Sequence, residues 1–310
     1  MTTLLVTHSS FADHDTGPGH PERPDRIRAV HKVLEHETFD DLVREEAPMG
    51  DLDAVERAHP DKYIEAVREV LPEDGLVRID ADTVISPKSW EAVLRAVGAG
   101  MLAVDKVMKR ETANAFCAVR PPGHHAEPAR AMGFCIFNSI AVAGLHARAS
   151  HGAERIAVMD FDVHHGNGTQ AMFWSDKDLY YGSTHQMPLF PGTGAVTETG
   201  VGNIFNAPLN PGDDGDEFRE AMRSRILPGL RDFRPDIVLI SAGFDAHRND
   251  PLANIGLVEE DFAWATQQLA EVADTCCEGR LVSMLEGGYD LDGLAKSVGV
   301  HVKVLMDAGS

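Results

Sequence analysis

Short runs of apolar residues recur along the chain, and four of them are followed by Gly or Pro and ionisable side chains. These runs cover residues 115–119, 156–159, 237–242 and 281–285. Continuous apolar runs of this length predict strands that are buried on both faces of a parallel sheet. Open parallel sheets bind ligands beyond the carboxyl ends of their strands, so we expect the four polar clusters to converge on one site.

Segments with a helical repeat of apolar residues lie between these runs. The three main stripes fall within residues 86–108, 218–230 and 262–273, and two shorter helices are expected at 24–34 and 60–71. Ser86-Pro87 is a typical helix start, and the acidic turn at 213–216 suits a helix amino terminus. The alternation of strands and helices predicts an α/β fold, in which a doubly wound sheet carries helices on both faces.

Length and composition favour one domain. The chain has 310 residues, and no Ser/Gly-rich linker, charge block or change in composition divides it, so residues 1–310 are expected to form a single catalytic domain. The longest loop is expected over residues 184–216, which are rich in Gly, Pro and Asn. No segment resembles a signal peptide or a membrane span, which predicts a cytoplasmic protein without a membrane partner.

The charge of the chain narrows the choice of partners. A formal net charge of −21 argues against nucleic acid, because proteins that bind it present a basic surface. A negative field attracts cationic substrates such as lysine-rich peptides or polyamines, although solubility alone also explains such a charge. The four cysteines have no disulfide or metal-binding spacing, so reduced thiols are expected.

The segment after the second run carries the densest chemistry. Residues 160–168 read Asp-Phe-Asp-Val-His-His-Gly-Asn-Gly. In an extended chain side chains alternate between faces, so Asp160, Asp162 and His164 are expected to project to one side. An Asp-x-His pair offers a hard oxygen and a borderline nitrogen, as zinc requires. Such a pair alone is more often a polar turn, but three further clusters placed in the same way favour a metal site.

Several motifs together resemble the zinc-dependent histone deacetylase family, which includes acetylpolyamine amidohydrolases and acetoin-utilisation proteins. The matching segments are residues 120–126 (Arg-Pro-Pro-Gly-His-His-Ala), 160–170, 243–246 (Gly-Phe-Asp-Ala) and 287–289 (Gly-Gly-Tyr). Residues 20–24 (His-Pro-Glu-Arg-Pro) and Asn167 are most similar to the class II branch and related bacterial amidohydrolases. The resemblance covers essentially the whole chain. It implies an arginase/deacetylase-like three-layer αβα fold with a central, mostly parallel sheet, and hydrolysis of an N-acetyl or N-acyl amide.

The resemblance assigns a role to each cluster. Asp162, His164 and Asp245 are expected to bind zinc and to leave a position open for water and the substrate carbonyl, as a catalytic zinc site requires. Potassium is expected beside the zinc, bound through backbone or side-chain oxygens of Asp160, Asp162, His164, Ser183 and Thr184. The resemblance also offers a second potassium position, near Phe173 and Asp176.

Five residues are expected to perform or support the proton transfers. His125 is the expected general base and acid, and His124 is its electrostatic and orienting partner. Asp160 is expected to orient His124, and Asn167 to orient His125. The pair of imidazoles is expected to share its titration. Tyr289, on a Gly-Gly turn, is expected to donate its hydroxyl to the developing oxyanion.

The substrate tunnel is matched in the same way. Phe134 and Phe190 are expected to line it, with Gly133 and Gly287 leaving room for an alkyl chain. At the rim, Asp80 or Asp82 is expected to accept N–H groups of the substrate. Polyamine-selective relatives place a carboxylate shortly after the third zinc ligand, where this chain has Leu252.

Three functions stay open at this stage. The leading hypothesis is a zinc deacetylase acting on acetyl-lysine in a peptide or protein, or on a small acetylated amine. The second is an acetylpolyamine amidohydrolase, which the uncharged Leu252 disfavours. The third is a non-catalytic acyl-lysine reader, which the presence of Tyr289 disfavours. Arginase-type hydrolysis would need a two-manganese cluster with more carboxylates. The sequence also allows a homo-oligomer.

Overall fold

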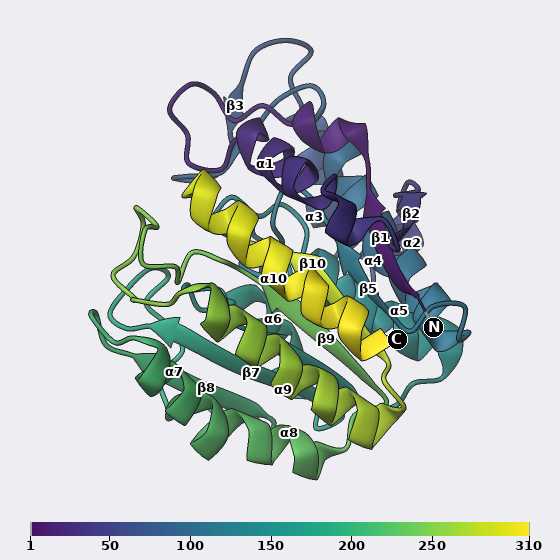
Figure 1. Cartoon of the computed structure of the whole chain (residues 1–310). Coiled ribbons are helices and arrows are strands. Elements are labelled where there is room, and N and C mark those ends of the chain that lie inside the picture. Colours follow the sequence, from purple (N-terminus) through teal and green to yellow (C-terminus); the bar gives the residue numbers. More distant parts are fainter. Residues whose placement is uncertain (1, 310) are drawn as a thin grey trace.

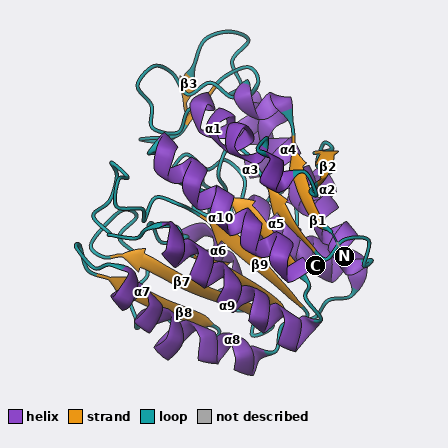
Figure 2. Ribbon diagram, viewed as in Figure 1, coloured by secondary structure: helices purple, strands orange, loops and turns teal. Residues whose placement is uncertain are grey.

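An eight-stranded sheet forms the centre of the computed structural model, which describes residues 2–309 (Figure 1, Figure 2). Its strand order is β2-β1-β5-β10-β9-β6-β7-β8, and every neighbouring pair is parallel. The strands are β1 (Thr3–Thr7), β2 (Val43–Glu46), β5 (Asn114–Cys117), β6 (Ile156–Asp160), β7 (Leu179–Gln186), β8 (Ile204–Leu209), β9 (Ile237–Ala242) and β10 (Leu281–Leu285). Two short strands, β3 (Val77–Arg78) and β4 (Val84–Ile85), form a separate antiparallel pair.

Helices cover both faces of the sheet. In Figure 1, α1, α9 and α10 lie in front of it, and α4 and α5 lie behind it. The α-helices are α1 (Pro24–Leu34), α2 (Leu52–Val55), α3 (Asp61–Glu69), α4 (Ser89–Met108), α5 (Ser139–His151), α6 (Asn167–Phe173), α7 (Gly215–Ala221), α8 (Leu227–Phe233), α9 (Glu259–Cys277) and α10 (Leu291–Gly309). Single turns of 3₁₀-helix occur at Ser9–Ala12 and Glu37–Phe39, and a π-helical turn at Met222–Ile226 joins α7 to α8. The predicted three-layer α/β fold with a parallel sheet is confirmed.

The hydrophobic core follows from the composition of the central strands. Every residue of β5, β6, β9 and β10 is buried, because helices cover both sides of these strands. The edge strand β2 is instead mostly exposed. Within residues 2–309, no helix has both the length and the apolar character needed to cross a membrane.

Most predicted elements are present, with three corrections. The predicted loop over residues 184–216 is wrong in part, since it contains the end of β7 and all of β8. The stripe at 218–230 is not one regular α-helix, because the π-helical turn interrupts it. The chain also does not stay extended after β6: residues 162–164 bend, and α6 begins at Asn167.

Candidate active site

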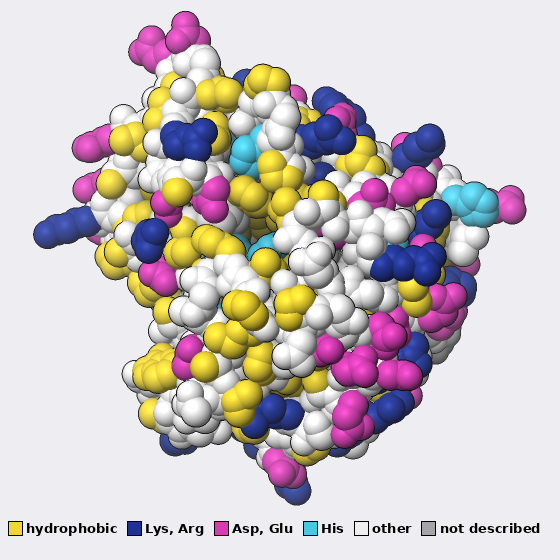
Figure 3. Space-filling view, turned by 90° about the vertical axis from the view of Figure 1, so that its left-hand side faces the viewer, with side chains coloured by type: hydrophobic (Ala, Val, Ile, Leu, Met, Phe, Trp, Pro, Cys, Tyr) yellow, Lys and Arg dark blue, Asp and Glu magenta, His cyan; other side chains and the backbone are white. Residues whose placement is uncertain are grey.

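The four predicted clusters meet beyond the carboxyl ends of four adjacent strands. His124 follows β5, Tyr289 follows β10, Asp245 follows β9, and Asp162 and His164 follow β6. These strands are neighbours in the order β5-β10-β9-β6. Figure 3 views the left-hand side of Figure 1, towards which the β7 arrow points, and shows histidine side chains within a patch of hydrophobic side chains.

The three predicted zinc ligands lie together and are buried. His164 Nδ1 is 3.1 Å from Asp162 Oδ1 and 3.1 Å from Asp245 Oδ2. The bend after β6 brings about this contact, because it turns the His164 ring back towards Asp162. Two carboxylates and one imidazole are donors that zinc accepts, and two buried carboxylates so close together call for a cation. Burial, followed by the charge of Asp162, raises the pKa of Asp245 to about 7. The residues present therefore fit a zinc ion.

The backbone fixes these carboxylates in position. The Val163 N–H donates to Asp245 Oδ1 over 2.8 Å, and the Gly287 N–H donates to Asp162 Oδ2 over 2.8 Å. A Cβ atom on Gly287 would lie 2.1 Å from Asp245 Oδ2, so only glycine allows this approach. Gly287 thus packs against the carboxylates, and it is not one of the residues that line the pocket described below.

The two imidazoles of the His pair have different partners. His124 Nδ1 is 2.9 Å from Asp160 Oδ2, and His125 Nδ1 is 2.9 Å from Asn167 Oδ1. The amide orientation of Asn167 follows from its other end, where Nδ2 donates to Glu127 Oε1 over 2.8 Å. The Oδ1 atom of Asn167 must therefore accept the Nδ1–H of His125. This hydrogen bond leaves the lone pair of a neutral His125 on Nε2.

The charges around the pair favour different protonation states for the two rings, whose centroids are 4.0 Å apart. Burial alone would lower the pKa of His124, but the charges of Asp160 and Asp162 raise it well above its usual value. Burial and then the charge of His124 hold the pKa of His125 well below its usual value. These opposite shifts favour a proton on His124 and a neutral His125.

Tyr289 is held by its backbone and by its ring. Its N–H donates to Asp250 Oδ2 over 2.7 Å. The ring lies 5.8 Å from that of Phe134, and the Arg26 guanidinium is 5.0 Å from the ring centroid. Burial, followed by the charge of Asp245, raises the pKa of Tyr289 well above its usual value. The phenol therefore keeps its proton and can act as a hydrogen-bond donor.

A narrow pocket of about 250 Å³ leads to these groups. Its lining consists of Asp82, His125, Gly133, Phe134, His164, Leu189, Phe190, Leu252 and Tyr289. The ring of Phe190 lies 5.1 Å from that of His125. A Cβ atom on Gly133 would lie 2.4 Å from His125 Cδ2, so glycine is required beside the imidazole.

The two candidate rim carboxylates have different surroundings. Asp82 lines the pocket and accepts the Gly133 N–H over 3.0 Å. Asp80 lies outside this pocket and forms an ion pair of 3.3 Å with Arg130. Of the two, Asp82 alone is among the residues that line the pocket.

The residues predicted to hold potassium lie at and after the end of β6 and in the neighbouring part of β7. Asp160 and Ser183 are partners in the register of these strands. Thr184 Oγ1 is buried and lacks a hydrogen-bond partner among the described residues. A buried hydroxyl without a partner is unusual, and a cation beside it would supply one. The donors of this region therefore fit a potassium ion.

The second predicted potassium position, near Phe173 and Asp176, stays a prediction. The carbonyl oxygens of Phe173, Asp176 and Leu179 all accept from one side-chain amide, Asn203 Nδ2, at 2.8, 3.0 and 2.6 Å. The Asp176 carboxylate is in turn 2.6 Å from Arg148 Nη1. Each of the three carbonyl oxygens has a second lone pair, which stays able to bind a cation at this position.

Sequence reasoning missed a buried ionic cluster behind the site. The Glu22 carboxylate binds both Arg120 and Arg26, and all three side chains are fully buried. Arg26 also donates to the carbonyl of Gly288 over 2.6 Å, which ties the cluster to the turn that carries Tyr289. The spacing of four residues between Glu22 and Arg26 is a signal that could have revealed part of this cluster.

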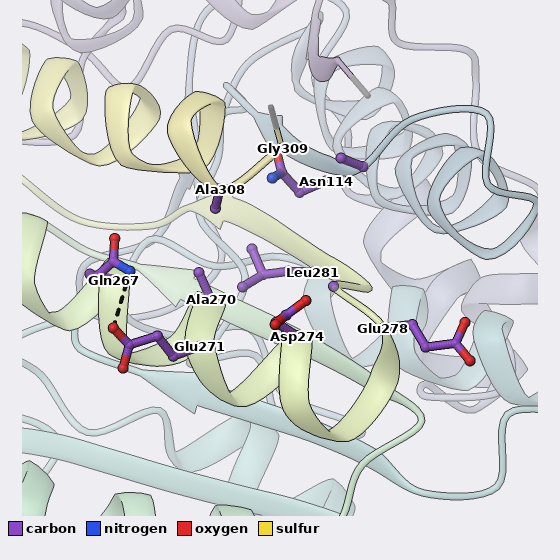
Figure 4. A pocket seen from close by; sticks show the side chains of 11 residues that line it. Asn114, Gln267, Ala270, Glu271, Asp274, Glu278, Leu281, Ala308 and Gly309 are labelled. Atoms are coloured by element: carbon purple, nitrogen blue, oxygen red, sulfur yellow. Dashed lines mark hydrogen bonds between the residues drawn. The ribbon is translucent and has the colours of Figure 1, made fainter.

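Another hollow, of about 440 Å³, lies at the opposite edge of the sheet (Figure 4). Asn114 and Leu281, the first residues of β5 and β10, form one side of it. The carboxylates of Glu271, Asp274 and Glu278 form another. Its described lining contains no His, Cys or Tyr. The His124–His125 pair and Tyr289 of the candidate active site instead follow the carboxyl ends of the strands.

An α/β fold that gathers an Asp-His-Asp set, a His pair and a Tyr at the end of a narrow pocket is typical of a hydrolase. The sequence matches the histone deacetylase domain over residues 20–305. It is 36% identical over 300 residues to a probable deacetylase of Archaeoglobus fulgidus, covering 94% of this chain and 83% of that protein. It is 40% identical over 293 residues to a histone deacetylase-like amidohydrolase of Pseudomonas aeruginosa, covering 92% and 77%.

A solved structure is similar over the same range. The crystal structure of the HDA15 HD domain superposes with a TM-score of 0.93 at 33% identity, covering 99% of this chain and 88% of that chain. The chain therefore belongs to the histone deacetylase family, a family of deacetylases and amidohydrolases.

Proposed function

We propose that residues 1–310 form one zinc-dependent deacetylase domain that hydrolyses N-acetyl or N-acyl amides, with acetyl-lysine in peptides or proteins as the main substrate. The observation that carries this proposal is the convergence, around one pocket, of the His125 imidazole, the Tyr289 phenol and a metal-binding set of which His164 lines the pocket. Asp162, His164 and Asp245 would hold the zinc. Zinc bound there would lower the pKa of a water molecule and polarise the acyl carbonyl.

His125 is the base in this proposal. Its Nε2 lone pair accepts a proton from the attacking water as the new C–O bond forms, and the same proton then goes to the leaving nitrogen as the C–N bond breaks. The products are a free amine and a carboxylate. His124, held as an imidazolium by Asp160, keeps a positive charge beside the reacting centre.

Tyr289 and the pocket walls complete the reaction. The Tyr289 O–H donates to the carbonyl oxygen as negative charge develops on it. Phe134 and Phe190 contact the alkyl chain of the substrate, and Asp82 accepts an N–H group at the rim. Potassium bound by Asp160, Asp162, His164, Ser183 and Thr184 would add positive charge next to the zinc ligands.

The side chain at Leu252 favours acetyl-lysine over acetylpolyamines. Leu252 lines the pocket and offers no charge to a second ammonium group of a polyamine. Hydrolysis of acetylpolyamines is therefore the second candidate function. A cytoplasmic location and the state of oligomerisation stay predictions.

Metal removal and two substitutions test the proposal. Acetate release from an acetyl-lysine peptide should cease after chelation and return when zinc is added back. His125→Ala should lower turnover by about two to four orders of magnitude. Tyr289→Phe should lower it by about two to three orders. Both variants should keep their zinc.

A matched phenol control and a variant of a zinc ligand complete the set. Tyr63→Phe removes a phenol that donates to the carbonyl of Ile136, outside the pocket, and should keep wild-type turnover. Asp245→Ala should lose zinc as well as activity. Full activity of the zinc-free protein, or wild-type turnover of Tyr289→Phe, would contradict the role assigned to the metal or to the phenol.

A further inference from the structure

A second group of metal-ligating side chains lies where helices α4 and α5 end. Asp105 is in the last turn of α4, and His146 and His151 are near the end of α5. Their candidate ligand atoms all lie within 4.8 Å of one another. Both helices lead into the amino ends of strands, β5 and β6, whereas the catalytic loops follow the carboxyl ends. The group is therefore at the opposite edge of the sheet from the candidate active site.

Both imidazoles direct the same atom towards one carboxylate oxygen. His146 Nε2 is 2.8 Å and His151 Nε2 is 2.6 Å from Asp105 Oδ1. The imidazole side chains are 9% and 13% exposed, and the carboxylate is 34% exposed. The nitrogens are therefore largely shielded from water, while the carboxylate leaves an opening through which an ion can enter. Hydrogen bonding alone is the competing explanation for this geometry.

A serine supports one ligand from behind. Ser150 Oγ is 3.2 Å from His146 Nδ1. When Nδ1–H donates to this hydroxyl, the Nε2 atom of His146 keeps its lone pair for a metal, which is the usual arrangement behind a ligating histidine. The carboxyl ends of two helices also meet here, and their partial negative charge favours a cation. The positive charge of Lys109, near Asp105, would repel a metal ion, but Lys109 is exposed and salt screens its charge.

We propose that Asp105, His146 and His151 bind a second divalent transition-metal ion, such as Zn²⁺, that links α4 to α5. Two imidazole nitrogens and one carboxylate oxygen suit zinc and its neighbours, and water would complete the coordination. Zinc bonds of about 2.0 Å in a tetrahedron place ligand atoms about 3.3 Å apart. The contacts of Asp105 Oδ1 with His146 and His151, at 2.8 and 2.6 Å, would thus have to lengthen by about 0.5 and 0.7 Å, which side-chain rotation can supply.

Counting bound zinc in matched variants tests the proposal. Wild-type protein and His151→Gln are dialysed against the same buffered Zn²⁺ solution, and zinc per chain is measured by mass spectrometry. We expect the wild type to hold one equivalent more than His151→Gln. This difference does not depend on the candidate active site, which both proteins share. His36→Gln, a change at an exposed histidine that contacts Thr38, should keep the wild-type count.

Ser150→Ala provides an independent measurement. Ser150 is exposed, so this variant should fold, and its melting temperature in chelator checks that it does. Loss of the hydroxyl behind His146 should weaken zinc at this site by about 10-fold to 100-fold, measured by competition with a chromophoric chelator. Equal zinc counts in the wild type and in folded His151→Gln would overturn the proposal. If His151→Gln does not fold, unchanged zinc affinity in Ser150→Ala would overturn it instead.

Discussion

Replacing Asn167 with Asp should move the acidic limb of the pH–rate profile to higher pH. Asn167 Oδ1 accepts a hydrogen bond from His125 Nδ1 over 2.9 Å, and the amide carries no charge. A carboxylate in its place would stabilise the protonated imidazole and so raise the pKa of His125. A general base works only when it is deprotonated. The rate would then reach its plateau only at a pH above the raised pKa.

The size of the shift follows from the geometry. Unit charges 4 Å apart interact by about 4 kcal/mol at an effective dielectric constant of about 20. Such a pair usually raises a pKa by about one to three units. Part of this increase in the pKa of His125 is offset. In the wild type Asn167 Nδ2 donates to Glu127 over 2.8 Å, and a carboxylate at position 167 would instead be repelled by Glu127. We therefore expect a shift of about one to two units, at about 1.4 kcal/mol for each unit.

A second substitution removes this offset. In Asn167→Asp/Glu127→Gln the donor and the acceptor exchange places, so the contact between positions 127 and 167 is kept and one carboxylate moves next to His125. The assay is kcat/KM across the pH range in which imidazoles titrate, since this profile reports the free enzyme. An unmoved acidic limb in the double variant, with zinc content and melting temperature unchanged, would refute the role of His125 as the base held by Asn167.

Three further predictions concern the substrate and stability. Leu252→Glu should raise kcat/KM for acetylspermidine relative to an acetyl-lysine peptide, by an amount equivalent to at most about 1 kcal/mol. This gain should decrease as salt is added, and a gain that does not depend on salt would contradict the prediction. Glu22→Gln leaves two buried arginines without their carboxylate and should cost about 3–5 kcal/mol in urea unfolding, whereas Asp25→Asn, at an exposed pair with Arg28, should cost less than about 1 kcal/mol. Burial lowers the pKa of His301 to about 3 in the folded protein, whereas the imidazole in the unfolded chain is protonated below about pH 6.5. The free energy of unfolding should therefore decrease as the pH falls below about 6.5, by about 2 kcal/mol at about pH 5. The decrease should be smaller in His301→Gln.

The central strands could be predicted from the sequence, whereas the edge strands could not. β9 and β10 have the predicted bounds, because a strand covered on both faces is a continuous apolar run. β8 was hidden within an expected loop, since it contains Asn206 and Pro208. Such residues are tolerated because β8 is at the edge of the sheet, where one side of the strand has no pairing partner. β2 is also an edge strand, and it is mostly exposed.

The candidate site was predictable where its residues follow strands, and less so where loops set the contacts. The meeting of the motifs follows from parallel topology alone. The partner of Tyr289, Asp250, could not be predicted, because the contact depends on how the loop after β9 folds back. Glu22 and Arg120 are likewise far apart in the sequence, and only the folded chain brings them together.

The catalytic loops are joined to one another by hydrogen bonds from the backbone of one loop to a carboxylate of the next. Glu286, after β10, accepts the N–H of Gly123 in the loop after β5. Asp162, after β6, accepts the N–H of Gly287 in the loop after β10. Asp245, after β9, accepts the N–H of Val163 in the loop after β6. Hydrogen bonds to a charged acceptor are stronger than neutral ones, and these are buried. The same carboxylates that would bind zinc therefore also hold the loops in register. Substituting a zinc ligand should consequently displace neighbouring loops as well as the metal. A loss of activity in such a variant therefore says little about the chemical step. A change at Tyr289 says more, because the Tyr289 side chain accepts none of these hydrogen bonds.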